Sequence, residues 1–187
     1  MGSSGDRLAT TRRKNAGAFE ALGVSVSYNP EDGPTRVVRT GNGTKIFTVG
    51  YERRSGEELL AELLALGIEI LVDVREKPIS RKPDFRRNAL EELCRATDIQ
   101  YVCMNQLGSP QRQREALRES GDFSAFRRNF LAYARRNLHA PLKELGNLVR
   151  KNAVALLCYE RRHEDCHRSL VANLVATELD STVVAID

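Results

Sequence analysis

Short apolar runs alternate with amphipathic stretches from residue 45 to the end of the chain. The apolar runs are rich in β-branched residues and predict buried strands at 46–50, 68–74, 99–104, 153–159 and 182–186. Between them, helical periodicity predicts helices at 55–67, 88–97, 109–120, from 123 onward and at 167–179. Five strands alternating with helices predict an α/β protein, a three-layer Rossmann-like sandwich around a mostly parallel five-stranded sheet.

The first predicted helix has the clearest boundary signals. Ser55 and Glu58 have the spacing of a capping box, in which each side chain bonds the backbone N–H of the other residue. Gly67 is the residue type that commonly follows the end of a helix. A later helix is predicted from one apolar stripe, formed by Phe123, Phe126, Phe130, Ala134 and Leu138.

The first 43 residues do not follow the alternation of strands and helices. They are rich in Gly, Ser, Thr and Arg, and their alternating stretches at 24–28 and 35–39 are compatible with a small hairpin. The basic tract 12–14 is typical of a solvated tail. We therefore expect a flexible or weakly structured extension at 1–43 and a single α/β domain at 44–187.

Composition and charge limit the class of protein and its compartment. The net charge of +4 does not by itself indicate a polyanionic partner. Six of the 29 basic residues are lysine and 23 are arginine, whose planar fork suits phosphate, although a GC-rich genome produces the same bias. The four cysteines lack the spacing of a secreted scaffold, and we find neither a signal peptide nor an apolar run of the roughly 20 residues that span a bilayer. We expect a cytoplasmic protein that does not enter a membrane. The sequence does not determine how many copies of the chain associate.

Polar and reactive residues follow three of the predicted strands, at 50–54, 73–75 and 158–160. Because the carboxyl ends of parallel strands meet at one edge of a sheet, we expect these residues to line a common cleft. The segment 161–169 continues the last of these strand ends into a helix N-terminus, where free N–H groups attract anions.

Arginines in this set predict an anion site. Arg75 and Arg168 are predicted to clamp phosphate, because a guanidinium matches two of its oxygens. Arg75 equally fits a structural bridge to Asp73 or Glu160. The other residues predicted to bind substrate or phosphate are Arg54, Tyr51, Arg81, Ser169 and Cys166.

The same set contains candidates for catalysis. Glu160 and His167 are predicted to act as an acid–base pair, although a histidine at a helix start is also a common cap or core residue. The other catalytic candidates are Cys158 and Asp73. A cysteine near a helix N-terminus and arginines can be a nucleophile, whereas one at the end of an apolar strand is often a small core residue.

An alternative role for Cys158 and Cys166 is to bind zinc. The candidate ligands are Cys158, His163, Cys166 and His167. The segment has no C-x-x-C pair, and chain neighbours such as Cys166 and His167 rarely point at the same ion. We therefore predict no metal. No glycine-rich phosphate loop is present, and we predict no cofactor.

The segment 75–87 carries six cations against two anions. It can follow a nucleic-acid backbone with Phe85 stacked on a base, or form a solvated lid whose Phe85 caps the core. The basic pairs at 127–128 and 135–136 are typical of a solvent-facing helix surface.

These residues resemble a family catalogued as domain of unknown function 488, over about residues 45–187. The resemblance rests on the residues at 48–51, Ser55, 73–75, 80–81, Phe85, Tyr101, 107–108, Cys158, Glu160 and 166–169. It implies a compact bacterial or archaeal α/β protein of Rossmann-like layering whose activity is unassigned.

A weaker likeness is to rhodanese domains, through 71–76 and through 155–159 followed by 168–169. Rhodanese and phosphatase loops wrap a cysteine around an anion with a short fixed spacing to an arginine. The spacing from Cys158 to Arg168 is too long and that from Cys166 to Arg168 too short, so such a cradle would need Arg161 or Arg162.

Three functions are compatible with the sequence. The first is an intracellular enzyme, a hydrolase or transferase, acting on a nucleotide or nucleic acid through the arginine cluster. The second is rhodanese-like or phosphatase-like transfer through Cys158, which predicts activity that alkylation abolishes. The third is a non-enzymatic nucleic-acid-binding module, which predicts salt-dependent binding that survives the loss of Glu160.

Overall fold

The computed structural model describes residues 35–39, 41 and 43–187. Its strands and helices follow one another along the chain as β1 (Thr35–Arg39), β2 (Lys45–Gly50), α2 (Gly56–Ala65), β3 (Ile70–Asp73), α3 (Arg87–Ala96), β4 (Gln100–Cys103), α4 (Gln111–Ser120), α5 (Phe123–Asn137), α6 (His139–Lys151), β5 (Val154–Cys158), α7 (His167–Leu179) and β6 (Thr182–Ile186). Single 3-10 turns occur at Pro83–Phe85, Asn105–Leu107 and His163–Asp165. No helix among these residues is long and apolar enough to cross a bilayer.

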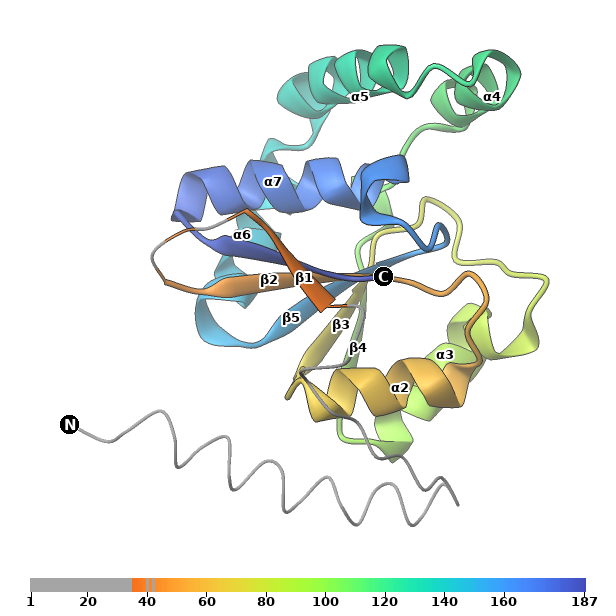
Figure 1. Ribbon diagram of the computed structural model, residues 1–187, viewed down its shortest axis with the longest axis vertical. Helices are drawn as coiled ribbons and strands as arrows, with labels where there is room; N and C mark the ends of the chain where they lie inside the picture. The colour runs from red at the N-terminus through yellow and green to blue at the C-terminus, as the bar shows by residue number, and fades with distance from the viewer. Residues whose placement is uncertain (1–34, 40, 42) are drawn as a thin grey trace.

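The strands form one sheet in the order β1-β6-β2-β5-β3-β4 (Figure 1). The five predicted strands, β2 to β6, are parallel to their neighbours, which confirms the mostly parallel α/β sheet. β1 adds an antiparallel edge strand beside β6, from a segment assigned above to the N-terminal extension. The other stretch of the predicted hairpin, 24–28, and the basic tract 12–14 lie outside the described residues.

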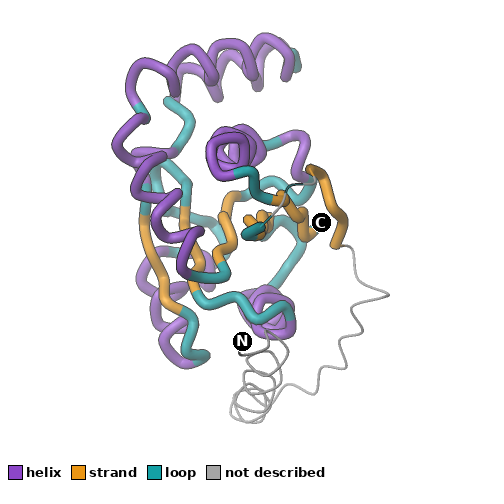
Figure 2. The backbone as a smooth tube through the Cα atoms, turned by 90° about the vertical axis from the view of Figure 1, so that its left-hand side faces the viewer, coloured by secondary structure: helices purple, strands orange, loops and turns teal. Residues whose placement is uncertain are grey.

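Helices cover both faces of the sheet (Figure 2). Side chains of α2 and α3 pack on one face, and those of α5, α6 and α7 belong to the core on the other. β5 lies inside the sheet and all its residues are buried. Val154, Leu156 and Cys158 contribute to the α7 side, whereas Ala155 and Leu157 contribute to the α2 side.

Local sequence signals account for the element boundaries, with one difference. The capping box forms, because the Ser55 side chain accepts from the Glu58 N–H and the Glu58 side chain from the Ser55 N–H. The helix predicted from residue 123 onward is two helices, since the chain turns at Leu138 between α5 and α6. Leu138 is buried and continues the apolar stripe, so the spacing of apolar residues gives no sign of the turn. Pro141, in the first turn of α6, is the available sequence signal.

Two neighbouring strands lead to helices on opposite faces of the sheet. β3 pairs with β5 in parallel, but β3 continues into α3 whereas β5 continues into α7. Their connections therefore diverge, which opens a crevice beyond the carboxyl ends of the strands. This topology locates the site described below.

Gly50, the last residue of β2, lies against the loop that follows β5. A Cβ atom on Gly50 would lie 1.8 Å from the Glu160 carbonyl oxygen and 2.9 Å from the Arg161 Cα. Beyond Gly50, the N–H groups of Tyr51 and Glu52 donate to the carbonyls of Cys158 and Tyr159. The missing side chain therefore lets the two chains stay paired past the ends of their strands.

Replacing Gly50 by alanine should displace this loop and lower the free energy of unfolding by about 1–3 kcal/mol, the usual effect of overpacking. Gly146→Ala is the matched control, because a Cβ there meets ordinary contacts of 3.8–4.0 Å within α6. We expect the control to stabilise by about 0.5–1 kcal/mol through helix propensity. Chemical denaturation measures both, and equal stabilities would contradict the steric argument.

Candidate functional site

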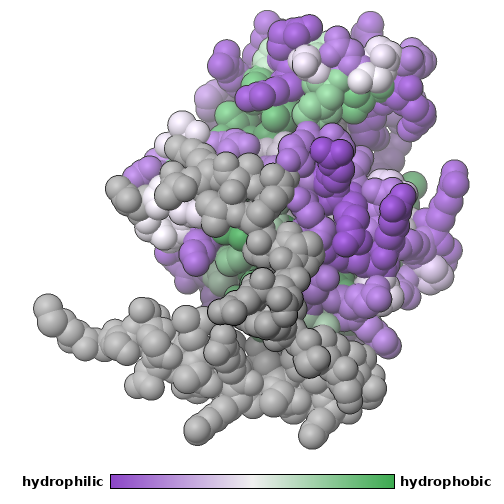
Figure 3. All heavy atoms as spheres, viewed as in Figure 1, coloured by the Kyte–Doolittle hydropathy of each residue, from purple (hydrophilic) through white to green (hydrophobic). Residues whose placement is uncertain are grey.

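A cleft of about 630 Å³ lies at the carboxyl ends of β2, β3 and β5. Its cationic lining consists of Arg75, Lys77, Arg81, Lys82, Arg114 and Arg118. Cys158, Glu160 and His167 also line it, and of these Cys158 and His167 are buried. On the side where the segment 75–87 extends, hydrophilic side chains dominate the surface (Figure 3).

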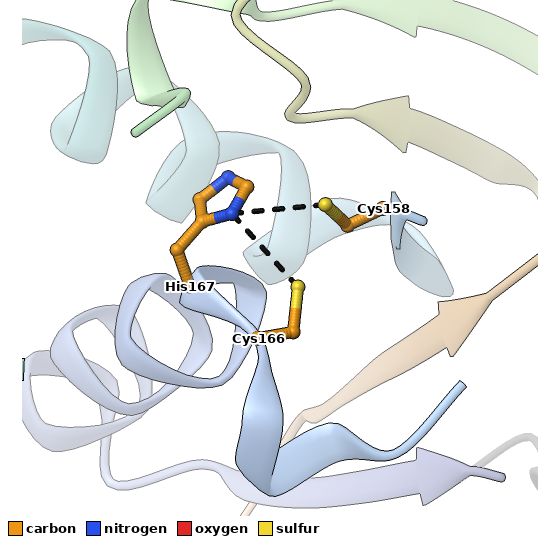
Figure 4. A group of neighbouring side chains, drawn as sticks. All are labelled: Cys158, Cys166 and His167. Atoms are coloured by element: carbon orange, nitrogen blue, oxygen red, sulfur yellow. Dashed lines mark hydrogen bonds between the residues drawn. The ribbon is translucent and has the colours of Figure 1, made fainter. Parts of the chain in front are cut away.

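Two thiols and an imidazole meet where Cys158 and His167 line this cleft. Cys158 ends β5, Cys166 is the N-cap of α7 and His167 is the first residue of that helix. The His167 Nδ1 atom lies 3.6 Å from the Cys158 Sγ and 3.8 Å from the Cys166 Sγ. Both thiols turn toward this nitrogen (Figure 4), and the three atoms all lie within 4.8 Å of one another.

The other ring nitrogen of His167 defines the state of the imidazole. Nε2 lies 2.9 Å from the Val74 carbonyl oxygen, which can only accept, so Nε2 carries a proton and donates it. Nδ1 is therefore the atom that the two sulfurs share. The His167 ring also lines the cleft.

Burial and mutual contact shift the protonation of this cluster. The pKa of the Cys158 thiol is raised well above its ordinary value by its contact with Cys166 and by burial. Burial opposes ionisation of Cys166, but contacts with Cys158 and His167 outweigh burial and lower the Cys166 pKa. Desolvation lowers the pKa of His167, but its contacts with Cys166, the Val74 carbonyl and Glu160 together outweigh this effect and raise it. The cluster thus favours a thiolate at Cys166 beside a protonated His167.

Glu160 stands beside the cluster. Its Oε2 accepts a hydrogen bond from the Cys158 Sγ at 3.4 Å. Burial, followed by the influence of Cys166, raises the Glu160 pKa to about 7. The predicted pair Glu160 and His167 therefore does meet at one edge of the sheet, where both side chains contact the sulfurs.

Arg168 is fully buried and forms hydrogen bonds with the loop before α7. Its guanidinium donates to the carbonyl oxygens of Glu160 and Arg161, the latter at 2.8 Å. Ser169 likewise turns inward, since its hydroxyl donates to the Cys166 carbonyl at 2.7 Å. Neither side chain lines the cleft.

Asp73 and Arg75 form a buried ion pair. The Arg75 Nε and Nη2 atoms donate to the two carboxylate oxygens of Asp73 at 2.8 and 2.6 Å. Arg75 Nη1 donates to the Tyr51 hydroxyl and to the Phe85 carbonyl, and the Tyr101 hydroxyl donates to Asp73 at 2.7 Å. This is the geometry of the structural bridge that the sequence left open beside a phosphate role.

Two further predicted residues have partners away from the thiols. Arg54 is buried against the Gly50 carbonyl at 2.6 Å and pairs with Glu62 at 3.0 Å, and burial lowers its pKa. Phe85 is fully buried and stacks on Tyr51 at 4.2 Å between ring centroids. Phe85 therefore caps the core instead of offering a face to a base.

The cleft brings together six of the predicted site residues, namely Tyr51, Arg75, Arg81, Cys158, Glu160 and His167. It also contains cations that the sequence did not single out, Arg114 and Arg118 of α4. Their four-residue spacing places them on one helical face, but nothing in the sequence indicates that this face meets the loop after β3.

Comparison with known proteins identifies the family of the chain. The model of the family Domain of unknown function DUF488 matches residues 55–175. The chain belongs to this family. The DUF488 match runs from the N-cap of α2 into α7 and so includes the two thiols, His167 and Glu160. No curated protein and no solved structure matches the chain, and the weaker likeness to rhodanese domains stays a prediction.

The thiols of Cys158 and Cys166 and the imidazole of His167 could together hold a metal ion. They are the one such group among residues 35–39, 41 and 43–187. The sequence argument against a shared ion does not apply here, because Cys166 and His167 do point at one position. His163, the fourth ligand type considered, lies elsewhere: its Nδ1 hydrogen-bonds the Thr48 hydroxyl at 2.8 Å.

Asp73→Asn should lower the free energy of unfolding by about 3 kcal/mol or more, because it leaves the Arg75 charge buried without its partner. Glu92→Gln is the control, since it breaks an ion pair with Arg95 whose side chains are both 73% exposed. An exposed pair contributes only about 0–1 kcal/mol. Thermal or urea unfolding compares the two variants, and similar small effects would argue that Arg75 is free to serve a ligand.

Proposed function

We propose that this DUF488 protein is an enzyme, a hydrolase or transferase, that acts on a nucleotide or nucleic acid bound in the cleft at the carboxyl ends of β2, β3 and β5. The observation that carries the proposal is the composition of that cleft. Six cations line it, and a carboxylate, a thiol and an imidazole gather beside them. Cationic walls attract phosphate, and the grouped reactive side chains supply chemistry where the phosphate binds.

We assign the contacts with phosphate to other arginines than Arg75 and Arg168, the pair predicted from the sequence to clamp it. Arg81 and Arg118 are exposed and form no ion pair with any residue that the structure describes, so their guanidinium groups can face a phosphate. The charge of Arg75 is largely neutralised by its bidentate pair with Asp73, so we assign Arg75 to holding that carboxylate in place. We assign Arg54 and Arg168 to positioning the loops instead of contacting the substrate.

Glu160 is the group that we assign to proton transfer. Its carboxylate lines the cleft, whereas the two nitrogens of His167 contact Val74 and the sulfurs. The other carboxylate of the lining, Glu76, pairs with Arg114 at 2.6 Å. We expect His167 to hold the thiols and the loop in place.

Transfer through Cys158 has less support. An anion cradle would need an arginine close behind the cysteine, but Arg162 pairs with Asp165 at 3.5 Å and Arg161 lies near the Asp187 carbonyl at 3.4 Å. The raised pKa of the Cys158 thiol also disfavours the thiolate that a nucleophile requires.

Binding tests the first part of the proposal. The probes are fluorescently labelled single-stranded DNA and RNA, with unlabelled mononucleotides and inorganic phosphate as competitors, followed by anisotropy at several salt concentrations. Arg81→Ala/Arg118→Ala should weaken binding about tenfold or more and reduce the salt slope by about 1.4, because two contacts with single-strand phosphates are lost.

The matched control for binding is Arg128→Ala/Arg135→Ala, which removes the same charge from exposed positions of α5. We expect the affinity of this control to stay within about twofold of the wild type, since long-range charge effects are screened. An equal loss in both double variants would indicate diffuse attraction over the arginine-rich helix faces and would contradict a specific cleft.

Turnover tests the second part. Glu160→Gln should bind the same probes with unchanged or slightly higher affinity, because a negative charge is removed, yet form product at least about 100-fold more slowly. Product is followed by separating labelled nucleotides before and after incubation. Binding without product in either protein would favour the non-enzymatic module and overturn the enzyme.

A further inference from the structure

We propose that Cys158, Cys166 and His167 bind a zinc ion, with the fourth coordination position open toward the cleft. The proposal goes beyond the enzyme described above, because it adds a resident metal and stands without any assumption about the substrate. It rests on the separation of the three ligand atoms, on the hydrogen bond behind the imidazole and on which ligands line the cleft.

The separations of the atoms fit one tetrahedral ion. With Zn–S near 2.3 Å and Zn–N near 2.0–2.1 Å, tetrahedral angles place a sulfur and a nitrogen about 3.5 Å apart. The two separations from His167 Nδ1 are 3.6 and 3.8 Å, and the two sulfurs lie within 4.8 Å of each other. An ion can therefore enter without a rearrangement of the backbone.

The imidazole is oriented as in a metal ligand. Its Nε2–H donates to the Val74 carbonyl, so Nδ1 is the nitrogen that faces the sulfurs, and its lone pair can bind an ion when the proton held there is released. Metal-bound histidines commonly donate their other ring N–H to a carbonyl or carboxylate, which fixes the tautomer and the ring. A proton held at Nδ1 between the sulfurs occupies the position that the cation would take.

Rigid elements present all three ligands. Cys158 ends a central strand, and Cys166 and His167 begin α7. The loop between them is tied down by Arg168, whose guanidinium donates to the carbonyls of Glu160 and Arg161. A preformed set of ligands of this kind binds a metal without the entropic penalty of ordering a loop.

The donor set selects the class of metal. Two thiolates and an imidazole favour zinc over magnesium or calcium, which prefer oxygen ligands. Placing a dication between two sulfurs also compensates the negative charge that the buried thiolates would otherwise carry.

The open position distinguishes this site from a structural zinc. Structural sites are closed by four protein ligands, whereas catalytic sites keep three and leave one position for water or substrate. Cys158 and His167 line the cleft, which is where we place the open position, and the Glu160 Oε2 lies 3.4 Å from the Cys158 Sγ. His163, bonded to Thr48, is not available as a fourth ligand.

Zinc titration of the full chain tests the proposal in the absence of substrate. The protein is kept reduced with a phosphine, stripped with a chelator and titrated with zinc chloride against a chromophoric chelator. We expect one equivalent per chain and a higher midpoint of thermal unfolding. Cobalt should give the sulfur-to-metal charge-transfer band and the intense visible bands of a tetrahedral ion. A cobalt spectrum without a thiolate band would overturn the site even before any variant is made.

Single variants assign the ligands. Cys158→Ser, Cys166→Ser and His167→Ala should each weaken zinc binding at least about 100-fold, since even changes behind a ligand weaken metal binding by about 10–100-fold. Cys103→Ser is the control, because Cys103 is a half-buried thiol on β4 outside the cluster, and it should bind zinc like the wild type. Circular dichroism checks that each variant is folded.

Three results would contradict the zinc site: no stoichiometric binding by the wild type, undiminished binding by folded cluster variants, or a Cys158–Cys166 disulfide that persists in place of metal under the reductant. None of these outcomes depends on nucleotide binding or turnover. Zinc binding with no nucleotide chemistry would leave this inference standing and remove only the proposed function.

Discussion

A fully buried arginine holds the region on which the site depends. Arg168 lies at the start of α7, and a charge removed from water needs hydrogen bonds that compensate its lost hydration. It donates to the carbonyls of Glu160 and Arg161, so the loop after β5 must fold back onto the helix that follows it. This contact brings the thiol at the end of β5 next to the residues that begin α7, and the bare Cα of Gly50 leaves room for the loop.

The arginines of this protein divide into two groups with different physical roles. Those nearest the strand ends, Arg54, Arg75 and Arg168, are buried, and backbone carbonyls or carboxylates accept hydrogen bonds from each of them. Those on the segment after β3 and on α4, such as Arg81 and Arg118, are exposed along the cleft. Internal arginines shape the crevice, and the positive potential that an anion would meet comes largely from the outer ones.

Much of the fold follows from local chemistry. The capping box at Ser55, the β-branched runs and the apolar faces of the helices predict five parallel strands and the helices between them, because each signal depends only on neighbours along the chain. The turn at Leu138 was missed, since a buried leucine continues the stripe of α5 while the chain changes direction. The pairing of Thr35–Arg39 with β6 was missed for a related reason, because an edge strand gains its partner from residues about 150 positions away.

The sequence by itself determined the α/β class, the DUF488 resemblance and the segment from Cys158 to Ser169 as the place where reactive side chains gather. Tertiary structure alone decided which of them meet. Strand order places β5 between β2 and β3, and the loop back to α7 turns both sulfurs toward the Nδ1 of His167 while Arg168 turns inward. Side-chain direction depends on burial and on hydrogen-bond partners from distant strands, which no local pattern encodes.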